Sequence, residues 1–412
     1  MIKILLYKLI NFYHRKKHLY TAYLSFFAMK CRGTNYKKRT QKKQNIKVLI
    51  NKVNKNKKKR LALFVAYHNS THIPLSNIEY IKFLSNCDFE VVYIHNGKLD
   101  QFVIERLIEL GCYLIIRDNI GQDFGAWKDA FSILEEHKID ELLDWILICN
   151  DSNFCLDGSN NKFAEYFTKN LEQQRNKDFI SLNCNFEYNL HFQSFFICFG
   201  KAVFNSIKFK DFWKQYKIIN NRYYAIEHGE MKLSKEVLSL YKGKVLLNNY
   251  ELYQNILLRV KDEDYYSFLD LIPKNQFLIN KLFKKNKFRD AIKKTISILE
   301  SYNPSHVFAL LFVYFYDSPF LKKDIVKSGL YSLIDIHELL LNKSLKEELL
   351  EEIMETYIKG GTIYSFASNI KEASKKGIPH YEKLHYFRNL DTVILDKKER
   401  RKIISKSLPI NY

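Results

Sequence analysis

The chain has 412 residues, enough for two or three domains, and 47% of them are hydrophobic, which excludes an intrinsically disordered protein. Its formal net charge of +21 comes from the N-terminus, because residues 1–60 hold 15 Lys and 4 Arg and no acidic residue. The rest of the chain contains 47 of the 66 basic residues and all 45 acidic ones. This nearly neutral body argues against a nucleic-acid groove across it.

Residues 1–60 form a basic segment that we predict to lie at a membrane surface. Apolar residues recur at helical spacing near its start: Ile2, Leu5, Leu6, Leu9 and Tyr13. A Lys/Arg tract follows at 37–60. An amphipathic helix with a polybasic tract suits an anionic lipid surface, whereas the longest apolar run, 19–29, is too short to span a bilayer. A packed helix with a solvated linker is the alternative, and nucleic-acid binding is a third. We therefore expect a cytoplasmic, peripheral protein on the inner face of the plasma membrane.

The chain has seven cysteines, and none of them forms a CxxC pair: Cys31, Cys87, Cys112, Cys149, Cys155, Cys184 and Cys198. The number is odd, and several lie in apolar runs. We expect buried, reduced thiols rather than disulfides or zinc ligands.

From Leu61 onward, apolar strands alternate with helices. Strands are predicted at 61–67, 89–94, 112–116 and 145–149, and helices at 78–84, 100–110 and 124–137. This βα repeat predicts an α/β fold, a mostly parallel sheet with flanking helices. Gly111 is expected to end the second helix. Shorter strands at 179–182 and 194–199 and helices at 209–216 and 231–241 follow, and from 273 the pattern predicts helices alone.

Polar residues close the first two predicted strands, as Tyr67-His-Asn69 and His95-Asn-Gly97. Ligands of open α/β sheets bind at the carboxyl ends of the strands, where residues such as these touch the base and ribose of a nucleotide. Tyr67, His68 and Asn96 are therefore candidate binding residues. Polar residues end most strands, so neither segment decides the function by itself.

The run Asn119-Ile-Gly-Gln-Asp-Phe-Gly-Ala-Trp127 is more specific. Gly121 and Gly125 permit close backbone approach and unusual dihedral angles. Asp123 lies near a helix start, where exposed amides favour a carboxylate. We take Asn119, Gly121, Asp123 and Trp127 as binding candidates; the alternative is that Asp123 only caps the helix and Trp127 only packs. The run is neither a dinucleotide-binding GxGxxG nor a P-loop.

Asn150, Asp151 and Ser152 follow the fourth strand and are similar to the acidic strand-end motif of metal-using sugar transferases. A carboxylate here can hold a divalent cation, Mg²⁺ or Mn²⁺, that bridges a diphosphate. Asp151 is the candidate metal ligand, but the motif has one Asp rather than two. Asp157 could supply a second ligand, or basic side chains could replace the ion. A strand-end Asp in a turn is the structural alternative.

Two later segments carry further candidates. His191, Gln193 and Ser194 could line a sugar or acceptor site. Inverting glycosyl transfer needs a carboxylate base for the acceptor hydroxyl; Glu230 is the candidate and Glu227 the reserve. The alternative is that both glutamates are exposed acids near a helix N-terminus, where they are electrostatically favoured.

Together these segments resemble the rhamnan synthesis protein F family of GT-A-like glycosyltransferases of bacterial surface polysaccharides. The resemblance runs from Leu61 to Lys323 and rests on these segments: 119–127, Asp144-Trp with 150–152, 191–196, 230–234, 303–306 and 319–323. It implies a GT-A-like sheet and transfer of a sugar, rhamnose or a related deoxyhexose, from a nucleotide donor. The acceptor would be a growing lipid-linked surface polysaccharide or lipopolysaccharide. Residues 1–60 are not part of the family pattern.

We therefore expect three parts: a basic membrane-proximal segment (1–60), a GT-A-like nucleotide-sugar transferase domain (61–272) and a helical C-terminal region (273–412). The expected partners are a nucleotide-diphosphate sugar, a lipid-linked glycan and an anionic membrane, and no nucleic acid. A non-catalytic scaffold of a polysaccharide assembly complex is the alternative. The enzymatic interpretation requires the loops after the third and fourth strands to converge on one edge of the sheet.

Overall fold

The computed structural model describes residues 47–49, 59–159, 161–174, 178–185, 190–259, 271–273, 290, 292–293, 296, 302–328, 330–331, 333–341 and 345–360. The predicted N-terminal amphipathic helix lies outside them. The chain divides into two compact units. Unit 1 takes Met1–Ile73, Leu84–Asp151 and Tyr166–Leu246, and unit 2 takes Pro74–Phe83, Ser152–Glu165 and Leu247–Tyr412.

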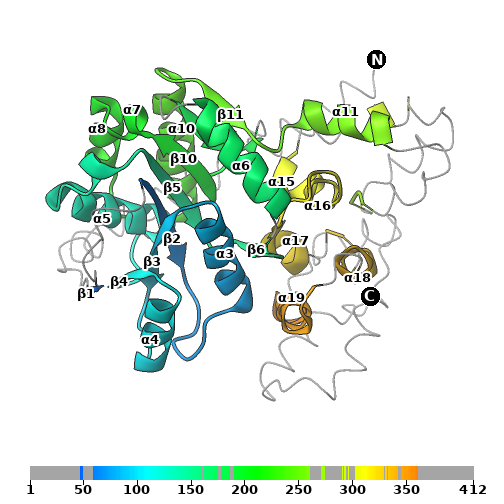
Figure 1. The fold of residues 1–412 in the computed structure, drawn as a ribbon, viewed down its shortest axis with the longest axis horizontal. Helices are drawn as coiled ribbons and strands as arrows, with labels where there is room; N and C mark the ends of the chain where they lie inside the picture. The colour runs from blue at the N-terminus through cyan, green and yellow to red at the C-terminus, as the bar shows by residue number, and fades with distance from the viewer. Residues whose placement is uncertain are drawn as a thin grey trace, which may run out of the picture. The chain divides into compact units, whose positions relative to one another are not determined.

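Among the described residues, unit 1 contains an eight-stranded sheet in the order β1-β4-β3-β2-β5-β10-β7-β11 (Figure 1). Its strands are β1 (Lys47–Leu49), β2 (Arg60–Ala66), β3 (Glu90–Asn96), β4 (Tyr113–Arg117), β5 (Trp145–Asn150), β7 (Phe179–Ser181), β10 (Phe196–Gly200) and β11 (Gly243–Val245). The strands β4, β3, β2 and β5 are mutually parallel neighbours, and β11 runs parallel to β7. β1 and β10 are antiparallel to their partners. The predicted mostly parallel sheet is confirmed.

The helical elements of unit 1 connect these strands. They are α4 (Gln101–Glu109), α5 (Gln122–Glu136), η1 (Asp140–Leu142), α7 (Lys201–Phe204), α8 (Ile207–Gln215), α9 (Arg222–Tyr224), the π-helix η2 (Ala225–Met231) and α10 (Lys232–Leu238). A short antiparallel pair, β8 (Cys184–Asn185) and β9 (His191–Phe192), precedes β10. The helices α3 (Leu75–Asn86) and α6 (Asn161–Gln174) contribute residues to both units. Gly111 follows α4 with φ +80°, which confirms the predicted helix end.

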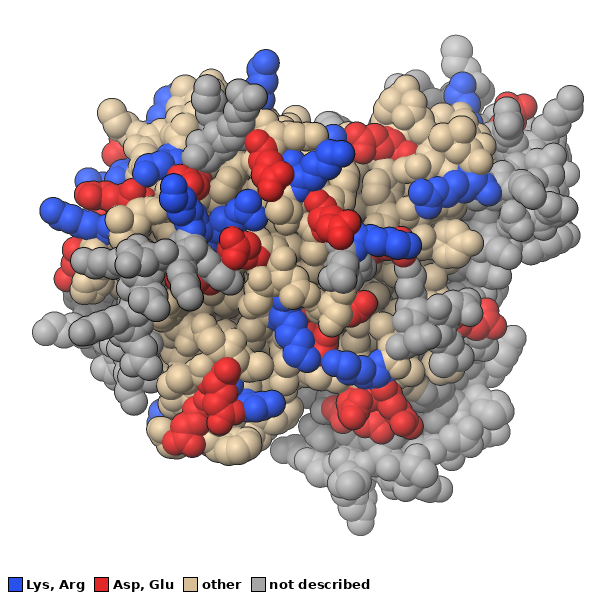
Figure 2. All heavy atoms as spheres, viewed as in Figure 1, with Lys and Arg blue, Asp and Glu red and all other residues tan. Residues whose placement is uncertain are grey.

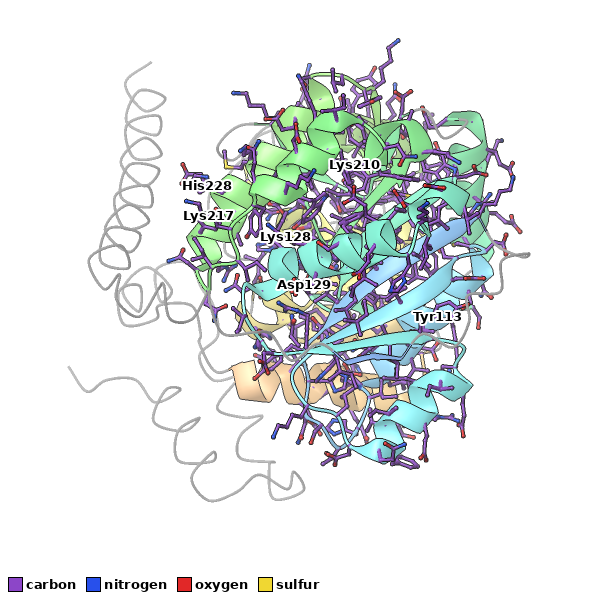
Figure 3. The ribbon with its side chains drawn as sticks, turned by 90° about the vertical axis from the view of Figure 1, so that its left-hand side faces the viewer. Tyr113, Lys128, Asp129, Lys210, Lys217 and His228 are labelled. Carbon is purple, nitrogen blue, oxygen red and sulfur yellow. The ribbon has the colours of Figure 1, made fainter. Side chains whose placement is uncertain are left out.

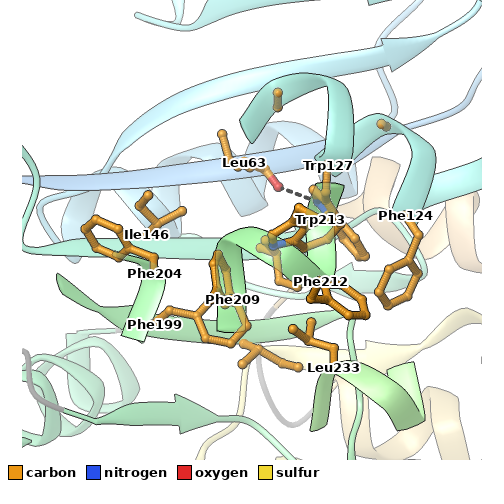
Figure 4. Packing of buried hydrophobic residues seen from close by; sticks show 14 of the residues in the cluster. Leu63, Phe124, Trp127, Ile146, Phe199, Phe204, Phe209, Phe212, Trp213 and Leu233 are labelled. Atoms are coloured by element: carbon orange, nitrogen blue, oxygen red, sulfur yellow. Dashed lines mark hydrogen bonds between the residues drawn. The ribbon is translucent and has the colours of Figure 1, made fainter. Parts of the chain in front are cut away.

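One face of the sheet is covered by aromatic side chains of α5 and α8. Phe124, Trp127 and Trp213 pack with Leu63 of β2 and Ile146 of β5 in a single buried cluster (Figure 4). The indole N–H of Trp127 donates a hydrogen bond of 3.1 Å to the carbonyl oxygen of Leu63. Burying each large apolar side chain contributes about 1.5–3 kcal/mol. This packing fixes α5 across the strands that carry the candidate site.

The opposite face of the same strands is also covered. Phe64 and Tyr93 meet edge to face at 5.4 Å between ring centroids, and Phe89 stacks on Phe167 at 5.8 Å. Phe167 also contacts Phe196 of β10 at 5.1 Å. Burial on both faces explains why these strands read as continuous apolar runs rather than alternating patterns.

The structure adds one strand that was not predicted and contradicts one prediction about secondary structure. The strand β1 lies within residues 1–60, where no strand was predicted, and it pairs with β4, with Lys47 opposite Ile116. The region after 273 is not helical alone, because β12 (Phe320–Lys322) pairs antiparallel with β6 (Asn153–Cys155). Strands of three residues are too short to show a period, and the partner of each is distant in sequence.

Unit 2 carries the helical C-terminal region, as predicted. Its described helices are α11 (Asn249–Arg259), α15 (Pro304–Val307), α16 (Ala309–Tyr316), α17 (Lys323–Ser328), α18 (Leu333–Leu341) and α19 (Glu347–Gly360). The ring of Phe320 contacts Tyr80, Phe83 and Phe163 at 4.9, 5.1 and 6.1 Å. The buried carboxylate of Glu79 accepts hydrogen bonds from Lys346 at 2.6 Å, among others.

In the part of the chain that the structure describes, the cysteines are mostly buried, as predicted. Lys, Arg, Asp and Glu side chains are interspersed on the face in Figure 2. No described helix is long and apolar enough to cross a bilayer. Six of the seven cysteines are described and none of these six forms a disulfide; burial raises the pKa of Cys87 and Cys112 to about 12.

Replacing Trp127 with Phe should lower the free energy of unfolding by about 1–3 kcal/mol, because it opens a gap and leaves the carbonyl oxygen of Leu63 without the indole donor. Urea unfolding followed by circular dichroism measures the change. Phe102→Leu is the matched control, since this side chain is 73% exposed. We expect the control to stay within about 0.5 kcal/mol of the wild type. Equal effects of the two changes would contradict the buried position of Trp127.

Candidate functional site

The strand order of unit 1 reverses between β2 and β5. The chain moves outward from β2 through β3 to β4, and α5 then returns it to β5 on the other side of β2. Ligands of open α/β sheets bind at such a switch point, beyond the carboxyl ends of the strands. Tyr67 follows β2 and Asp151 follows β5. The amide of Tyr67 donates to Oδ2 of Asp151 at 2.9 Å, so the two strand ends meet there.

The two sequence motifs are joined by a hydrogen bond between side chains. Nδ2 of Asn150, at the end of β5, donates to Oδ2 of Asp123 at 2.7 Å. Asp123 lies in the first turn of α5, and Asn150 is 6% exposed. The loops after β4 and β5 therefore converge at one edge of the sheet, as the enzymatic interpretation requires.

Glycine is required at the start of α5. Gly121 has φ +79°, and a Cβ there would stand 2.4 Å from Cγ2 of Ile218. Its amide also donates to Oδ1 of Asn220. A Cβ on Gly125 would stand 2.6 Å from the carbonyl oxygen of Ile120. The sequence indicated the glycines, but only the structure identifies the segment that packs against them.

Arg117 organises the same loop, and the sequence analysis did not single it out. This guanidinium is buried at the end of β4 and donates through Nε to Asp129 at 2.7 Å. Its other nitrogens donate to the side chain of Asn96 and, at 2.7 Å, to the carbonyl oxygen of Ile120. Burial lowers the pKa of Arg117 and raises that of Asp129, yet arginine stays charged in proteins. The sequence did contain a signal for this role: an arginine that ends an apolar strand is expected to be buried, and a buried arginine needs partners for its charge.

Lys128 anchors α5 on its other side. Its ammonium donates to the carbonyl oxygens of Lys214 and Tyr216 at 2.9 and 2.6 Å. These carbonyls lie at the C-terminal end of α8, where cations are favourable. Burial lowers the pKa of Lys128. Lys128 and Asp129 are consecutive on α5 (Figure 3), so one helical turn is tied both to α8 and to β4.

The later motifs meet at Glu230. Its carboxylate lies 3.3 Å from Nε2 of His191 and accepts hydrogen bonds from the amide and hydroxyl of Ser194 at 2.7 and 2.6 Å. The hydroxyl of Ser234 donates to the Glu230 carbonyl oxygen at 2.7 Å. We call these four residues the Glu230 cluster. It lies next to the α5 motif, because the neighbouring Gly229 packs directly on the Phe124 ring.

The environment of Glu230 bears on its predicted role as a base. Burial acts to raise the pKa of Glu230, but the hydrogen bonds from His191 and Ser194 outweigh it, and the pKa lies below its usual value. A carboxylate stabilised as the anion is a weak base. Glu227 is exposed on the same π-helix, a type of helix that is frequent at functional sites.

The remaining candidates occupy different environments. Tyr67 and Asn119 are exposed, and His68 is half-buried, with Nε2 2.7 Å from the hydroxyl of Tyr93. Gln193 is buried beside the Glu230 cluster. Ser152 belongs to unit 2, where its hydroxyl accepts a hydrogen bond of 2.7 Å from Lys322.

Two candidates are held by the fold rather than presented to a ligand. Trp127 is completely buried, so its indole packs in the core and its N–H is used by Leu63; its predicted contact with a substrate is wrong. Asn96 is 2% exposed, and its amide oxygen accepts from Arg117. Trp127 is buried because α5 packs on the sheet, and Asn96 is buried because the end of β3 is covered.

One side chain at the switch point, Asp151, is suited to bind a divalent cation. Mg²⁺ in phosphate-transfer sites is commonly held by one or two carboxylates together with substrate phosphates, and Asp151 is a half-buried carboxylate at the switch point. The described residues contain no group of three or more His, Cys, Asp or Glu that could hold a metal ion by themselves. Asp157 lies in unit 2, where Oδ1 accepts from the amide of Ser159 at 2.8 Å. The cation stays a prediction.

Comparisons with known proteins add one firm match. The family model described as rhamnan synthesis protein F matches residues 91–365. A curated protein of Sinorhizobium fredii (strain NBRC 101917 / NGR234), "Uncharacterized protein y4gN", is 30% identical over 173 residues. The match covers 39% of this chain and 43% of that protein, so it spans less than half of either.

A solved structure gives a weaker similarity. The glycosyltransferase GlyE of Streptococcus pneumoniae TIGR4 is 13% identical and matches over 64% of this chain and 65% of its own, with a TM-score of 0.29. At this score the similarity supports no conclusion about the fold. The GT-A-like character of the sheet therefore stays a prediction.

The lowered pKa of Glu230 predicts a pH-dependent contribution to stability. The ionised carboxylate stabilises the fold above the usual glutamate pKa of 4.5, and this contribution is lost as pH falls through the lower pKa of the folded state. Glu230→Gln should cost about 1–3 kcal/mol at pH 7 and progressively less below about pH 4. Urea unfolding at several pH values measures the difference. Glu227→Gln is the matched control, and a pH-independent difference for Glu230→Gln would contradict the stabilised anion.

Proposed function

The chain belongs to the rhamnan synthesis protein F family, and from this premise we propose that it is a glycosyltransferase of polysaccharide synthesis. The observation that carries the proposal is the hydrogen bond between Asn150 and Asp123, which joins the two motifs at the switch point between β2 and β5. A nucleotide-sugar donor needs a site of this kind, where a diphosphate can lie beyond the strand ends.

The donor diphosphate lies beside Asp151 and Asp123. Two carboxylates next to a diphosphate repel it unless a cation intervenes, so their position supports the predicted Mg²⁺ or Mn²⁺. Asp151 would hold the ion, which when bound neutralises charge on the nucleotide leaving group. Asn150 positions Asp123 by its hydrogen bond of 2.7 Å. The exposed Asn119 completes this edge.

The Glu230 cluster forms the sugar side of the site. His191 and Ser194 are both bound to the carboxylate of Glu230, which therefore orients them. Glu230 was predicted as the base; its stabilised anion fits orientation better than proton abstraction. Glu227 is then the stronger candidate for the base, because it is exposed one turn earlier. Losing either role lowers kcat, but only loss of the base abolishes the acidic limb of the pH–rate profile, the fall in rate at low pH where the base becomes protonated.

The finer assignments extend the same proposal. The donor sugar is rhamnose or a related deoxyhexose, and the acceptor is a lipid-linked surface polysaccharide or lipopolysaccharide. The enzyme works at the cytoplasmic face of the plasma membrane. The basic segment that would hold it there lies outside the described residues, apart from the short strand β1 and the residues next to β2. Its support is the charge of residues 1–60.

Binding of nucleotides tests the proposal directly. UDP, dTDP or GDP should raise the melting temperature of the full chain, because a ligand that binds only the folded state stabilises it by mass action. Asp123→Asn should reduce this rise in melting temperature, and it should lower the rate of sugar transfer to a membrane extract by at least about tenfold. The change removes the charge that Asn150 positions. Asp211→Asn, on the exposed surface of α8, is the matched control.

Three outcomes separate the alternatives. Absence of any shift with every nucleotide would reject the enzyme and favour the non-catalytic scaffold of an assembly complex. Transfer that survives EDTA would reject the cation while leaving the enzyme in place. Transfer that is unchanged in both Asp123→Asn and Asp151→Asn would reject the assigned edge.

A further inference from the structure

Three large aliphatic side chains are exposed beside the amino-terminal edge of the parallel strands, the edge opposite Asp151. Leu142 lies in η1, shortly before β5, and is 49% exposed. Ile207 begins α8 and is 78% exposed, and Leu240 follows α10 and is 48% exposed. A single exposed apolar residue needs no explanation, whereas several that share one surface mark an interaction site.

The short helix α7 connects the first of these side chains to the edge. Gly200, at the end of β10, lies opposite Trp145 at the start of β5, so α7 begins at the amino-terminal edge. Nζ of Lys201 in α7 donates to the carbonyl oxygen of Glu141 in η1 at 2.8 Å. Leu142, the next residue after Glu141, is therefore adjacent to α7.

The end of α10 meets α7 and α8 at the same place. The hydroxyl of Tyr241 donates to the carbonyl oxygen of Ala202 in α7 at 2.9 Å. Nζ of Lys208, near the start of α8, donates to the hydroxyl of Ser239 at 3.3 Å. Ser239 and Tyr241 flank Leu240 in the chain. The three exposed aliphatic residues thus belong to neighbouring elements (Figure 1), and all of these elements are in unit 1.

Lysines surround two of the three aliphatic side chains. Residues 201–208 and 235–244 contain five lysines, three of them exposed, and one acidic residue. The charge beside Leu142 is mixed, because Glu141 is exposed there. We call Leu142 and the exposed residues of these two segments the basic edge.

The basic N-terminal segment joins the sheet at the same edge. β1 ends at Leu49, opposite Leu114 near the start of β4, and β2 begins at Arg60, opposite Trp145. Residues 50–58 connect these two points and contain four lysines and no acidic residue. Both ends of this lysine-rich connection are therefore at the amino-terminal edge, which adds to the positive charge there.

We propose that the basic edge is a docking surface for an anionic lipid bilayer, in which Leu142, Ile207 and Leu240 enter the headgroup region and the lysines contact lipid phosphates. Apolar burial and attraction to anionic lipid add in such a contact. A symmetric contact with a second copy of this chain is disfavoured, because it would bring like charges together. The inference rests on the proposed function and deepens it, since it names the part of the folded chain that faces lipid.

Docking at this edge turns the proposed nucleotide site away from the bilayer. β2 runs from the basic edge to the site with seven residues, which span about 20 Å. Asp151 therefore stands about 20 Å from the lipid surface. A growing glycan extends from its lipid into water, so its free end reaches a site in this position.

Quenching of a fluorescent label on the full chain tests the inference. Ile207→Cys is labelled with an environment-sensitive fluorophore and mixed with vesicles that carry nitroxide-labelled lipid. Vesicles of phosphatidylcholine and phosphatidylglycerol in equal parts should quench the label, and vesicles of phosphatidylcholine alone should not, because the lysines require anionic lipid. The wild type treated with the same reagent gives the background from the native cysteines.

Phe102→Cys is the matched control for the label. Phe102 is 73% exposed at the start of α4, beyond the carboxyl end of β3, where the amide of Asp100 donates to the carbonyl oxygen of Ser70. The label at this position should stay unquenched on the same anionic vesicles. Equal quenching at both positions would contradict the proposed orientation.

Sedimentation with the same vesicles measures the contribution of the aliphatic side chains. The double change Ile207→Ser and Leu240→Ser should weaken binding to anionic vesicles by at least about tenfold, because the apolar area that enters the headgroup region is lost. Phe102→Ser should leave the binding unchanged. Both proteins should keep the wild-type melting temperature, since all three positions are exposed.

Two results would overturn the inference. Binding of vesicles without quenching at position 207 would reject the basic edge and leave the lipid contact to residues 1–60. Absence of binding to anionic vesicles would reject it as well, and a dimer that the double change dissociates would then assign the edge to a second copy. The rise in melting temperature with UDP, dTDP or GDP reports separately on the proposed function.

Discussion

The buried guanidinium of Arg117 is the interaction on which the arrangement of the site depends. It connects the end of β3, the loop before α5 and the body of α5 through Asn96, Ile120 and Asp129. A planar group with five donors in fixed geometry can serve three partners at once, which lysine cannot. Removing one partner of a buried ion pair costs about 3–5 kcal/mol, because a charge is left uncompensated. The loop that carries Gly121 and Asp123 is thereby held in one conformation.

Rigid packing then transmits this order to the rest of unit 1. Lys128 fixes α5 to α8, and Trp127 fixes α5 to β2. Gly229 of the π-helix packs on the ring of Phe124. The Glu230 cluster is thus connected to the strand-end motif through packed aromatic rings. Sites on a sheet edge need such support, because their side chains must be oriented before a ligand arrives. The proposed function places the nucleotide-sugar donor at this edge.

Polar residues at the strand ends divide into two groups, and the division separates support from recognition. Asn96 and Arg117 satisfy each other inside the protein. Tyr67 and Asp151 meet at the edge, where Asn150 also binds Asp123. Asn96 and Arg117 are buried, whereas Tyr67 is exposed and Asp151 is half-buried, so exposure distinguishes a supporting residue from a recognition residue. Strand-end position alone does not distinguish them.

The sequence by itself determined the parallel strands, the helix between β4 and β5, the glycine-rich start of α5 and the family. Each is a local property. Buried parallel strands require continuous apolar runs, and a left-handed backbone conformation in the residue before a helix favours glycine. Only the tertiary structure decided that Trp127 packs in the core, that Asn220 binds Gly121 and that β12 pairs with β6. It also decided which polar atoms find partners and which do not. These outcomes depend on contacts between residues far apart in the chain, and no local period or spacing encodes them.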